Sequence, residues 1–433
     1  MNKKVLIITY YWPPAGGPGV QRVLKFAKYL PEFGWDPIIL TVSDGEYPAI
    51  DESLAKDIPN NCKVYKTKAL EPNFFYRKFT GMKAGEKIPV ANLAQKNVSW
   101  KKKLANWVRL NLFIPDAKIG WIPYAVSEGK RIIKKENPDI IFSSSPPPTV
   151  HLIAKKLAKW SKIKWVADFR DPWTKIHYLQ NQKVNPVSKR RNERLERNVV
   201  NECNKASCVS ANFINLITEN RKDKFEIITN GYDIETDGIA KPTKPNEKFT
   251  ILYIGGLTWN RYYKSFFIWL IELINNGDLD RNKVRIKLAG SIEPTIKREI
   301  EEMFSELNIL DLEGYLPHSE AISLMQKADL LLLFLEQVEG YEGHIPGKLF
   351  EYLSTYNRIL GLGNTGGESS QILENSNAGK IFEPRNEQEI KKYIISEFCN
   401  WQNGKKSEIN SSNIDKFSRR QLTEQLATLF EKL

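Results

Sequence analysis

The sequence of 433 residues predicts an α/β fold made of two doubly wound domains that face each other across a cleft. Short apolar runs that are typical of buried parallel strands alternate with helical patterns, first in the N-terminal half and again from residue 249. In both halves a glycine-rich loop follows an apolar strand. Sheets of this kind bind ligands at the carboxyl ends of their strands, so we expect the functional site in the cleft.

Four apolar runs in the first half predict strands, and amphipathic patterns between them predict helices. The expected strands cover residues 5–10, 37–42, 140–144 and 165–169, and the clearest helical patterns cover residues 126–135 and 150–159.

The first expected strand leads into a loop that contains Gly16 and Gly17, and apolar residues then recur at helical spacing through residues 20–30. Backbone amides of such a loop can approach an anion closely, although glycines after a strand also serve tight turns.

The tract 241–246 is rich in proline and poor in apolar residues, and it predicts the domain boundary. We expect an N-terminal domain over residues 1–240, a C-terminal domain over residues 241–413 and, over residues 414–433, a C-terminal helix that can pack back on the first domain. The second half is expected to contain strands at residues 249–254, 284–289, 330–335, 358–362 and 379–382.

The most informative segment of the second half begins at Pro346, where a helix is expected to start. Lys348 and Glu351 then lie at i and i+3 on one helical face, and Gly366 and Gly367 follow in a glycine loop. A cation there suits a phosphate group, a carboxylate suits ribose hydroxyls, and a helix N-terminus favours anions, so the segment predicts a nucleotide diphosphate site.

The net charge of +13 is carried entirely by the first half of the chain. Residues 1–230 contain 40 Lys and Arg against 21 Asp and Glu, a charge of +19, whereas residues 231–433 carry −6. The excess indicates an anionic partner for the first half, for which nucleic acid, an acidic membrane surface and a phosphorylated acceptor are all admissible, as is a basic face without a partner.

Residues 71–124 depart from the alternation and form a basic, aromatic insertion. Around a predicted helix, aromatic side chains share one face and basic side chains flank it, a pattern suited to the surface of an anionic membrane or to a lipid-linked acceptor. The residues are Trp100, Lys101, Lys102, Lys103, Trp107 and Arg109. The alternative is a helix that packs its tryptophans on the domain core.

No run reaches the roughly 18 to 20 apolar residues that a membrane span requires, and the start of the chain does not have the pattern of a signal peptide. We therefore expect a cytoplasmic protein that is at most peripheral at the inner face of the membrane. The cysteines show no metal-ligand spacing, and the acidic pair Asp278 and Asp280 lies in a polar loop. No metal and no cofactor are expected.

Taken in order, seven motifs resemble the retaining GT-B glycosyltransferases of family 4, which include enzymes of bacterial surface polysaccharide and lipopolysaccharide synthesis. The motifs are Gly16-Gly17, residues 143–147, 168–173, 228–231, 253–257, 314–318 and 346–351. The resemblance covers nearly the whole chain and implies two Rossmann-like domains, with the nucleotide sugar on the C-terminal one and the acceptor on the N-terminal one.

The resemblance also assigns roles to individual residues. Arg261 and Lys348 would neutralise the departing diphosphate, Asp171 is a candidate to take the acceptor proton, and Glu351 would bind the ribose. The residues expected to contact substrate are Gly16, Gly17, Arg170, Gly256, Leu316, Glu342, Glu351, Gly366 and Gly367.

One motif departs from the family pattern. The first glutamate of the paired-glutamate motif is expected at position 343, where this chain has Gly343, and Glu342 stands one place earlier. Either a shift of the loop brings Glu342 to the donor sugar or that contact is absent.

The sequence therefore predicts a glycosyltransferase that moves a sugar from a nucleotide diphosphate to an acceptor hydroxyl, with retention of configuration, on a surface polysaccharide or its lipid-linked precursor. Two alternatives are a sugar-nucleotide epimerase of similar architecture and a catalytically silent subunit that binds a nucleotide sugar. A nucleic-acid binder is disfavoured, because nothing is typical of a recognition helix.

Overall fold

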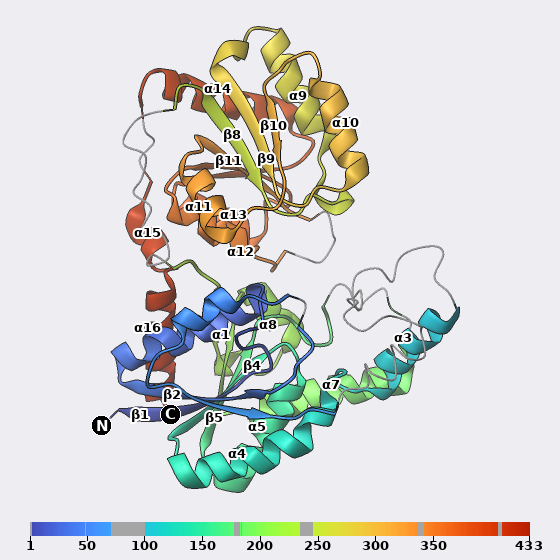
Figure 1. Cartoon of the computed structure of the whole chain (residues 1–433), viewed down its shortest axis with the longest axis vertical. Helices are drawn as coiled ribbons and strands as arrows, with labels where there is room; N and C mark the ends of the chain where they lie inside the picture. The colour runs from blue at the N-terminus through green and yellow to red at the C-terminus, as the bar shows by residue number, and fades with distance from the viewer. Residues whose placement is uncertain are drawn as a thin grey trace. The chain divides into compact units, whose positions relative to one another are not determined.

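The computed structural model describes residues 2–47, 49–70, 100–176, 182, 184–233, 246–336, 342–405 and 409–433, and for residues 18, 101 and 102 it describes the backbone alone. The first part of the predicted insertion, residues 71–99, lies outside this description. The chain divides into unit 1, which is Met1–Thr229 with Arg419–Leu433, and unit 2, which is Asn230–Ser418 (Figure 1).

Unit 1 is built on a seven-stranded parallel sheet with the order β3-β2-β1-β4-β5-β6-β7. The strands are β1 (Lys3–Ile8), β2 (Trp35–Val42), β3 (Lys63–Thr67), β4 (Ile140–Ser145), β5 (Lys164–Phe169), β6 (Lys205–Cys208) and β7 (Phe225–Ile227).

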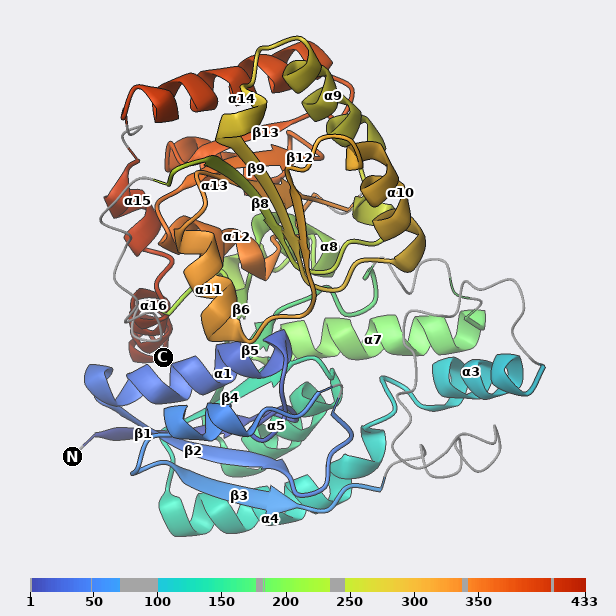
Figure 2. The same ribbon diagram turned by 45° about the horizontal axis from the view of Figure 1, so that its top comes forward.

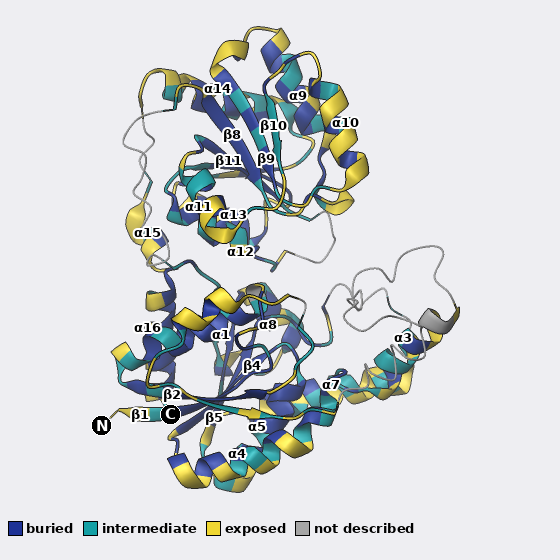
Figure 3. Ribbon diagram, viewed as in Figure 1, coloured by how far each residue is buried: buried dark blue, intermediate teal, exposed yellow. Residues whose placement is uncertain are grey.

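Helices cover both faces of this sheet. Successive side chains of its central strands are apolar and point to opposite faces, so both faces must be buried. Val5 and Ile7 of β1 belong to one core cluster with helices α1 (Pro18–Tyr29) and α16 (Arg419–Glu431). Leu6 and Ile8 belong to the opposite cluster, with α4 (Ile122–Glu136), α5 (Thr149–Ser161), α7 (Pro186–Glu202) and α8 (Ala211–Ile217). Figure 3 shows the strands as buried and the outer helix faces as exposed.

The last helix, α16, packs on unit 1 although it follows unit 2 in the sequence (Figure 2). Its Phe430 ring lies edge to face against Trp35 at 5.1 Å and against Phe142 at 5.7 Å between ring centroids. These contacts tie the C-terminus of the chain into the first core.

Unit 2 is built on a six-stranded parallel sheet with the order β10-β9-β8-β11-β12-β13. The strands are β8 (Phe249–Ile254), β9 (Val284–Ala289), β10 (Leu310–Glu313), β11 (Leu330–Phe334), β12 (Arg358–Leu362) and β13 (Gly379–Phe382).

Helices cover both faces of the second sheet as well. Helices α9 (Lys264–Asn275), α10 (Pro294–Phe304) and α14 (Glu387–Gln402) pack on one face. The other carries α11 (His318–Gln326), α12 (Gly347–Ser354), α13 (Glu368–Asn375) and α15 (Ser411–Asp415). The prediction of two doubly wound, Rossmann-like domains is confirmed.

Every strand predicted from the sequence is present, with shifts of a few residues at some ends, and four short strands were missed. The missed strands are β6 and three of the four edge strands, β3, β7 and β10, where apolar runs are short or broken by polar residues. The fourth edge strand, β13, was predicted. The chain passes from unit 1 to unit 2 after Thr229, earlier than the expected boundary at residue 240, and returns after Ser418. Tyr232 explains the earlier crossing, since its N–H donates to the Phe417 carbonyl at 3.1 Å within unit 2.

Candidate functional site

The order of strands reverses once in each sheet, between β1 and β4 in unit 1 and between β8 and β11 in unit 2. At such a switch point the loops after neighbouring strands diverge to opposite faces, which opens a crevice outside the carboxyl ends of the strands. Both switch points are therefore candidate sites.

In unit 2 a tyrosine fixes helix α12 over the switch point. The Tyr352 hydroxyl accepts a hydrogen bond from the Ile254 N–H of β8 at 3.2 Å and donates to the Leu332 carbonyl of β11 at 3.2 Å. Because one side chain bridges both strands, the first turn of α12 is held next to the end of β8. The helix starts at Gly347 with Pro346 as N-cap, as the sequence predicted.

Lys348 lies in this first turn, and its side chain is half-buried. Its Nζ donates to the Ile254 carbonyl at 3.2 Å and lies 4.2 Å from the centroid of the Tyr253 ring. A Cβ at Gly255 would lie 3.4 Å from the same Nζ, so glycine leaves the nitrogen room at the end of β8. Burial lowers the pKa of Lys348 to about 7, with a further contribution from the charge of Arg261 and an opposing one from Glu351.

Arg261, the second predicted phosphate-binding cation, is close enough to affect that pKa. It ends the short 3-10 helix Trp259–Arg261 after β8, and its Nη2 lies 2.5 Å from Oε1 of Glu336, which follows β11. The structure therefore places two cations at the switch point and a carboxylate that holds one of them.

A pocket of about 280 Å³ opens beside these cations at the ends of β8, β9 and β10. Its shape depends on Gly290, where φ is +121° and a Cβ would stand 2.4 Å from the Gly255 carbonyl oxygen, so the loops after β8 and β9 can approach only without a side chain there. Gly256 and Leu316, both predicted from the sequence, line the pocket. The remaining lining residues are Ile254, Gly255, Ala289, Gly290, Ser291, Tyr315 and Ala321.

Glu351 and Glu342 occupy different surroundings. Glu351 is one turn beyond Lys348 on α12 and half-buried. Glu342 is exposed, and its carbonyl oxygen accepts from the Glu368 N–H at 3.4 Å. A Cβ at Gly367 would stand 3.0 Å from that carbonyl, so Gly366 and Gly367 lie directly beside the segment that carries Glu342.

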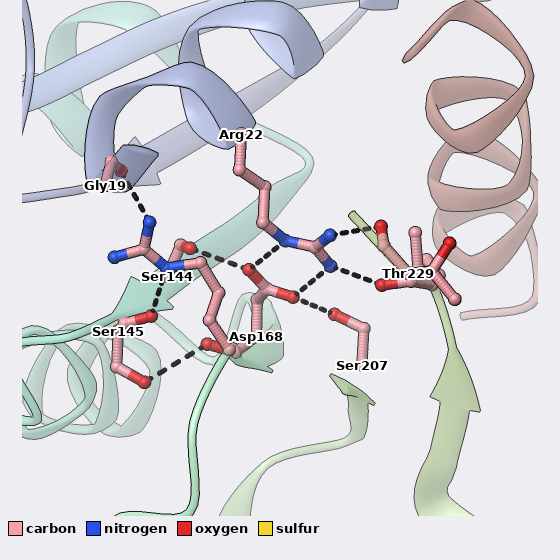
Figure 4. A network of polar contacts seen from close by, with 9 residues as sticks. Gly19, Arg22, Ser144, Ser145, Asp168, Ser207 and Thr229 are labelled. Carbon is pink, nitrogen blue, oxygen red and sulfur yellow. Dashed lines mark hydrogen bonds and ion pairs between the residues drawn. The ribbon is translucent and has the colours of Figure 1, made fainter. Parts of the chain in front are cut away.

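In unit 1 the corresponding region is filled by a buried ion pair that sequence reasoning did not find (Figure 4). Arg22 of α1 and Asp168 of β5 are both fully buried and meet through two hydrogen bonds of 3.0 and 2.8 Å. Asp168 also accepts from Ser144 at 2.6 Å and Ser207 at 2.7 Å. These partners hold the pKa of Asp168 below its usual value against the opposing effect of burial, which is the largest single influence on it.

The same arginine holds the end of the first sheet. Arg22 donates to the Thr229 carbonyl at 2.6 Å and to the Ile228 carbonyl at 2.8 Å, directly before the chain leaves unit 1. The pairing residues lie 146 positions apart. The one sequence signal for this ion pair was an arginine among the apolar residues of a predicted helix.

Arg170, predicted to contact substrate, is buried and bonded to main-chain carbonyls. It donates to Ser145 at 2.7 Å, to Gly19 at 2.6 Å and, more weakly, to Pro146 at 3.4 Å. Its guanidinium therefore joins the first turn of α1 to the end of β4 and the residue after it, across the switch point. Asp171 beside it is half-buried.

The glycine loop of unit 1 is partly engaged by the protein itself. The Gly16 N–H donates to the Ala49 carbonyl at 2.8 Å, so this amide is bonded within unit 1, contrary to the expectation that it faces an anion. Gly17 has φ of +90° and precedes α1 without a side-chain cap, which explains the requirement for glycine there.

His151, at the start of α5, was also missed and is a core residue. Its Nδ1 lies 2.8 Å from Oγ of Ser143, which accepts from Trp165 at 2.8 Å, and its ring lies 4.6 Å from that of Phe169. Burial lowers the pKa of His151 to about 3, so it is neutral at physiological pH.

The predicted aromatic helix is α3 (Trp100–Leu112), and its tryptophans lie on the surface. Trp100 is 67% exposed and Trp107 45% exposed, which disagrees with the alternative of packing on the core. Lys103 is exposed and Arg109 half-buried, and the side chains of Lys101 and Lys102 lie outside the described residues. In the described part of the chain, no helix is long and apolar enough to cross a membrane, and no cluster of His, Cys, Asp or Glu could hold a metal ion.

Residues 93–236 match the family model described as Glycosyltransferase Family 4. No curated protein matches the sequence significantly.

Several solved structures share the fold over the whole chain. A glycosyltransferase from Rickettsia africae is 17% identical with a TM-score of 0.62, covering 100% of this chain and 98% of its own. HepE from Anabaena in complex with UDP is 13% identical with a TM-score of 0.60 and full coverage of both chains. The lipopolysaccharide outer core galactosyltransferase WaaB in its apo form is 13% identical with a TM-score of 0.56, covering 99% of this chain and 100% of its own.

The two parallel sheets have the GT-B arrangement of these structures, and the family model spans the segment that carries Asp168 and Arg170. Residues 93–236 are similar to glycosyltransferase family 4, and the chain as a whole has the GT-B fold of these structures.

Proposed function

We propose that the protein transfers a sugar, with retention of configuration, from a uridine diphosphate sugar to a hydroxyl group of a surface polysaccharide or lipopolysaccharide acceptor. The observation that carries the proposal is the half-buried ammonium group of Lys348, with Arg261 near it, beside the pocket of unit 2. A cation that burial makes costly to keep charged is best compensated by an anionic ligand.

The donor fits the unit 2 switch point in three parts. The base occupies the pocket lined by Gly256 and Leu316. The diphosphate lies against Lys348 and Arg261, and the ribose hydroxyls bond to the Glu351 carboxylate one turn along α12. HepE binds UDP in a structure that shares this fold, which supports uridine diphosphate as the first nucleotide to test.

Catalysis in this proposal depends on the charge that develops on the leaving diphosphate. As the bond to the sugar breaks, negative charge grows on the departing diphosphate, and the cations Lys348 and Arg261 stabilise it more strongly than they stabilise the bound donor. Arg261 must share or leave its contact with Glu336 to do so.

Glu342 is the proposed substitute for the missing glutamate at position 343. Its carbonyl lies beside Gly366 and Gly367 at the start of α13, so its exposed carboxylate can reach a sugar held at that loop. We expect Glu342→Gln to lower transfer while leaving the affinity for UDP alone unchanged, since UDP lacks the sugar.

For unit 1 we propose acceptor binding, with Asp171 as the group that takes the acceptor proton. Arg170 positions the first turn of α1 against the end of β4 through its three carbonyl contacts. The lipopolysaccharide class of acceptor is supported by the likeness to WaaB and by the charge of +19 in residues 1–230, which suits a phosphorylated glycan.

The test is a panel of nucleotide sugars assayed for thermal stabilisation of the purified protein, followed by transfer or slow hydrolysis with those that bind. Uridine diphosphate sugars should raise the melting temperature of the native protein but not of Glu351→Gln. Stabilisation by a purine nucleotide sugar alone would replace the uridine assignment, and binding without turnover on any acceptor tested would favour a silent binding subunit.

A further inference from the structure

Glu336 places a carboxylate directly beside the cations of the proposed donor site. It follows β11 by two residues, and its Oε1 lies 2.5 Å from Nη2 of Arg261. The preceding Leu335 is fixed by two hydrogen bonds. Its N–H donates to the Leu362 carbonyl of β12 at 3.0 Å, and its carbonyl accepts from the Tyr263 hydroxyl at 2.9 Å. The carboxylate is therefore carried by a backbone that is held at the carboxyl end of the second sheet.

The position of Glu336 depends on the packing around Leu335 as well. At Gly363, where φ is +151°, a Cβ would stand 2.7 Å from the Leu335 Cβ, so the loop after β12 fits there only as glycine. Tyr263 is buried, and its ring lies edge to face with that of Phe334 at 5.5 Å between centroids. The core thus determines where the carboxylate lies, and the ion pair with Arg261 is not needed to hold it there.

A diphosphate bound at this site would compete with the Glu336 carboxylate. The pKa of Lys348 is lowered first by burial and then by the charge of Arg261, so the two cations lie within electrostatic reach of each other. The side chains of Arg261 and Glu336 are 26% and 19% exposed, so an anion can approach the pair. Whether the guanidinium shares its donors or exchanges them, the ligand and the carboxylate then lie next to each other and repel.

This repulsion differs between the substrate and the product of the proposed reaction. A nucleotide sugar carries about one charge on each of its two phosphates, because the sugar blocks the terminal one. Loss of the sugar leaves a terminal phosphate that loses a second proton near pH 6, so the free nucleoside diphosphate has about one further negative charge at pH 7. A fixed carboxylate therefore disfavours the product more than the donor.

We infer that Glu336 is a specificity-determining residue that weakens the binding of the nucleoside diphosphate product by competing with it for Arg261. Transfer of the sugar then leaves a ligand that the site holds less well, and the product is released. The inference rests on the proposed donor site of unit 2 and adds to it a group that acts against binding. Glu336 thus differs from Glu351, which is proposed to bind the ribose hydroxyls.

The experiment measures binding of UDP, ADP and GDP to the full-length protein by isothermal titration calorimetry. For the diphosphate that binds the native protein, Glu336→Gln should lower the dissociation constant by about tenfold, since a like charge is removed beside the ligand. Loss of a residue that only supports the fold would weaken binding or leave it unchanged. Either of these results overturns the inference.

Two variants separate the local charge from other effects. Glu397→Gln removes the same charge from another arginine pair, with Arg358 at 3.1 Å, at the amino end of β12 and thus at the opposite edge of the sheet. It should leave the affinity for the diphosphate unchanged. Glu336→Asp keeps the charge and should tighten binding by no more than about threefold. A gain in either variant equal to that of Glu336→Gln contradicts the inference, and thermal melting of each variant checks the fold.

A double-variant cycle tests whether Glu336 acts through Arg261. In the Arg261→Met background the gain from Glu336→Gln should shrink to less than about threefold, because the guanidinium for which the two anions compete is gone. An equal gain in both backgrounds would mean that the carboxylate acts on the ligand directly, and it would overturn the competition for Arg261.

Kinetics with the nucleotide sugar that the protein uses distinguish product from donor. Glu336→Gln should lower the inhibition constant of the diphosphate product more than it lowers the donor KM, and the opposite order contradicts the inference. If no nucleoside diphosphate binds either the native protein or the variant, the proposed donor site fails together with this inference. If the native protein binds one and Glu336→Gln does not bind it more tightly, the inference alone fails.

Discussion

In unit 1 the charged groups beside the switch point are buried and bonded to the protein, whereas in unit 2 the cations at the equivalent place adjoin a pocket. Arg22 and Asp168 neutralise each other, and their remaining hydrogen-bonding capacity goes to serines and main-chain carbonyls. Lys348 instead has a carbonyl and an aromatic ring as neighbours, and its pKa is lowered to about 7.

The two domains have similar topology but use their charged groups at the switch point in different ways. A buried ion pair with every partner supplied by the chain fixes a conformation, and removal of one member leaves the other uncompensated. A half-buried cation without a paired carboxylate, such as Lys348, is stabilised when an anion binds beside it, which suits a binding site. The following predictions test this contrast, beginning with the largest effect.

Removal of the charge of Asp168 should strongly destabilise unit 1. We expect Asp168→Asn to lower the free energy of unfolding by about 3 to 5 kcal/mol, because Arg22 is left buried without its counter-charge. Urea unfolding measures the change, with Asp171→Asn as the control three residues along the chain. The double variant Arg22→Met with Asp168→Leu should recover much of the loss, and a fall below about 1 kcal/mol in the single variant would show that the pair is dispensable.

Removal of the charge of Lys348 should affect turnover and not folding. Lys348→Met is expected to lower kcat for cleavage of the donor by about a hundredfold to a thousandfold, as for loss of one preorganised group at a developing charge. The donor KM should change less. Lys297→Met, at an exposed pair on α10, is the control. A raised KM with an intact kcat would mean that Lys348 only anchors the bound donor.

Glu351 offers a sharper test of where the nucleotide lies. We expect Glu351→Gln to weaken donor binding by about tenfold to over a hundredfold, the equivalent of roughly 1.5 to 3 kcal/mol for hydrogen bonds to a charged group. Isothermal titration calorimetry with the donor measures it, and Glu301→Gln on α10 is the control. Equal affinity in the two variants would remove Glu351 from the site.

The smallest effect is in the pH dependence of donor binding. Lys348 is protonated below its pKa of about 7 and neutral above it, so donor affinity should fall as pH rises through 7, by at most about tenfold per pH unit. Binding near pH 7 should also be accompanied by proton uptake, detected as a calorimetric enthalpy that varies with the buffer. In Lys348→Met this fall in affinity near pH 7 should be absent, because the diphosphate of a sugar nucleotide has no proton to lose in that range, and an identical profile in both proteins contradicts the coupling.

Prediction from the sequence succeeded where the signal was local. Strands β8, β9, β12 and β13 were predicted to the residue. For β8 the signal was an apolar run, which is typical of a buried parallel strand. A helix start at Pro346 was predicted, and α12 begins one residue later, at Gly347. Edge strands such as β3 were missed, since a half-exposed strand does not need such a run.

The amino-acid sequence by itself determined the two doubly wound sheets, the glycine loops, the split of charge between the halves and the pairing of Lys348 with Glu351 on one helical turn. All of these depend on neighbours a few residues apart or on composition. Only the tertiary structure decided that Arg22 lies against Asp168, that Arg170 joins α1 to the end of β4, and that Asn111 of α3 accepts from the Asn185 N–H at the start of α7. These contacts join residues far apart in the chain, and the relative placement of α1, β5 and α7 exists only after each sheet has assembled.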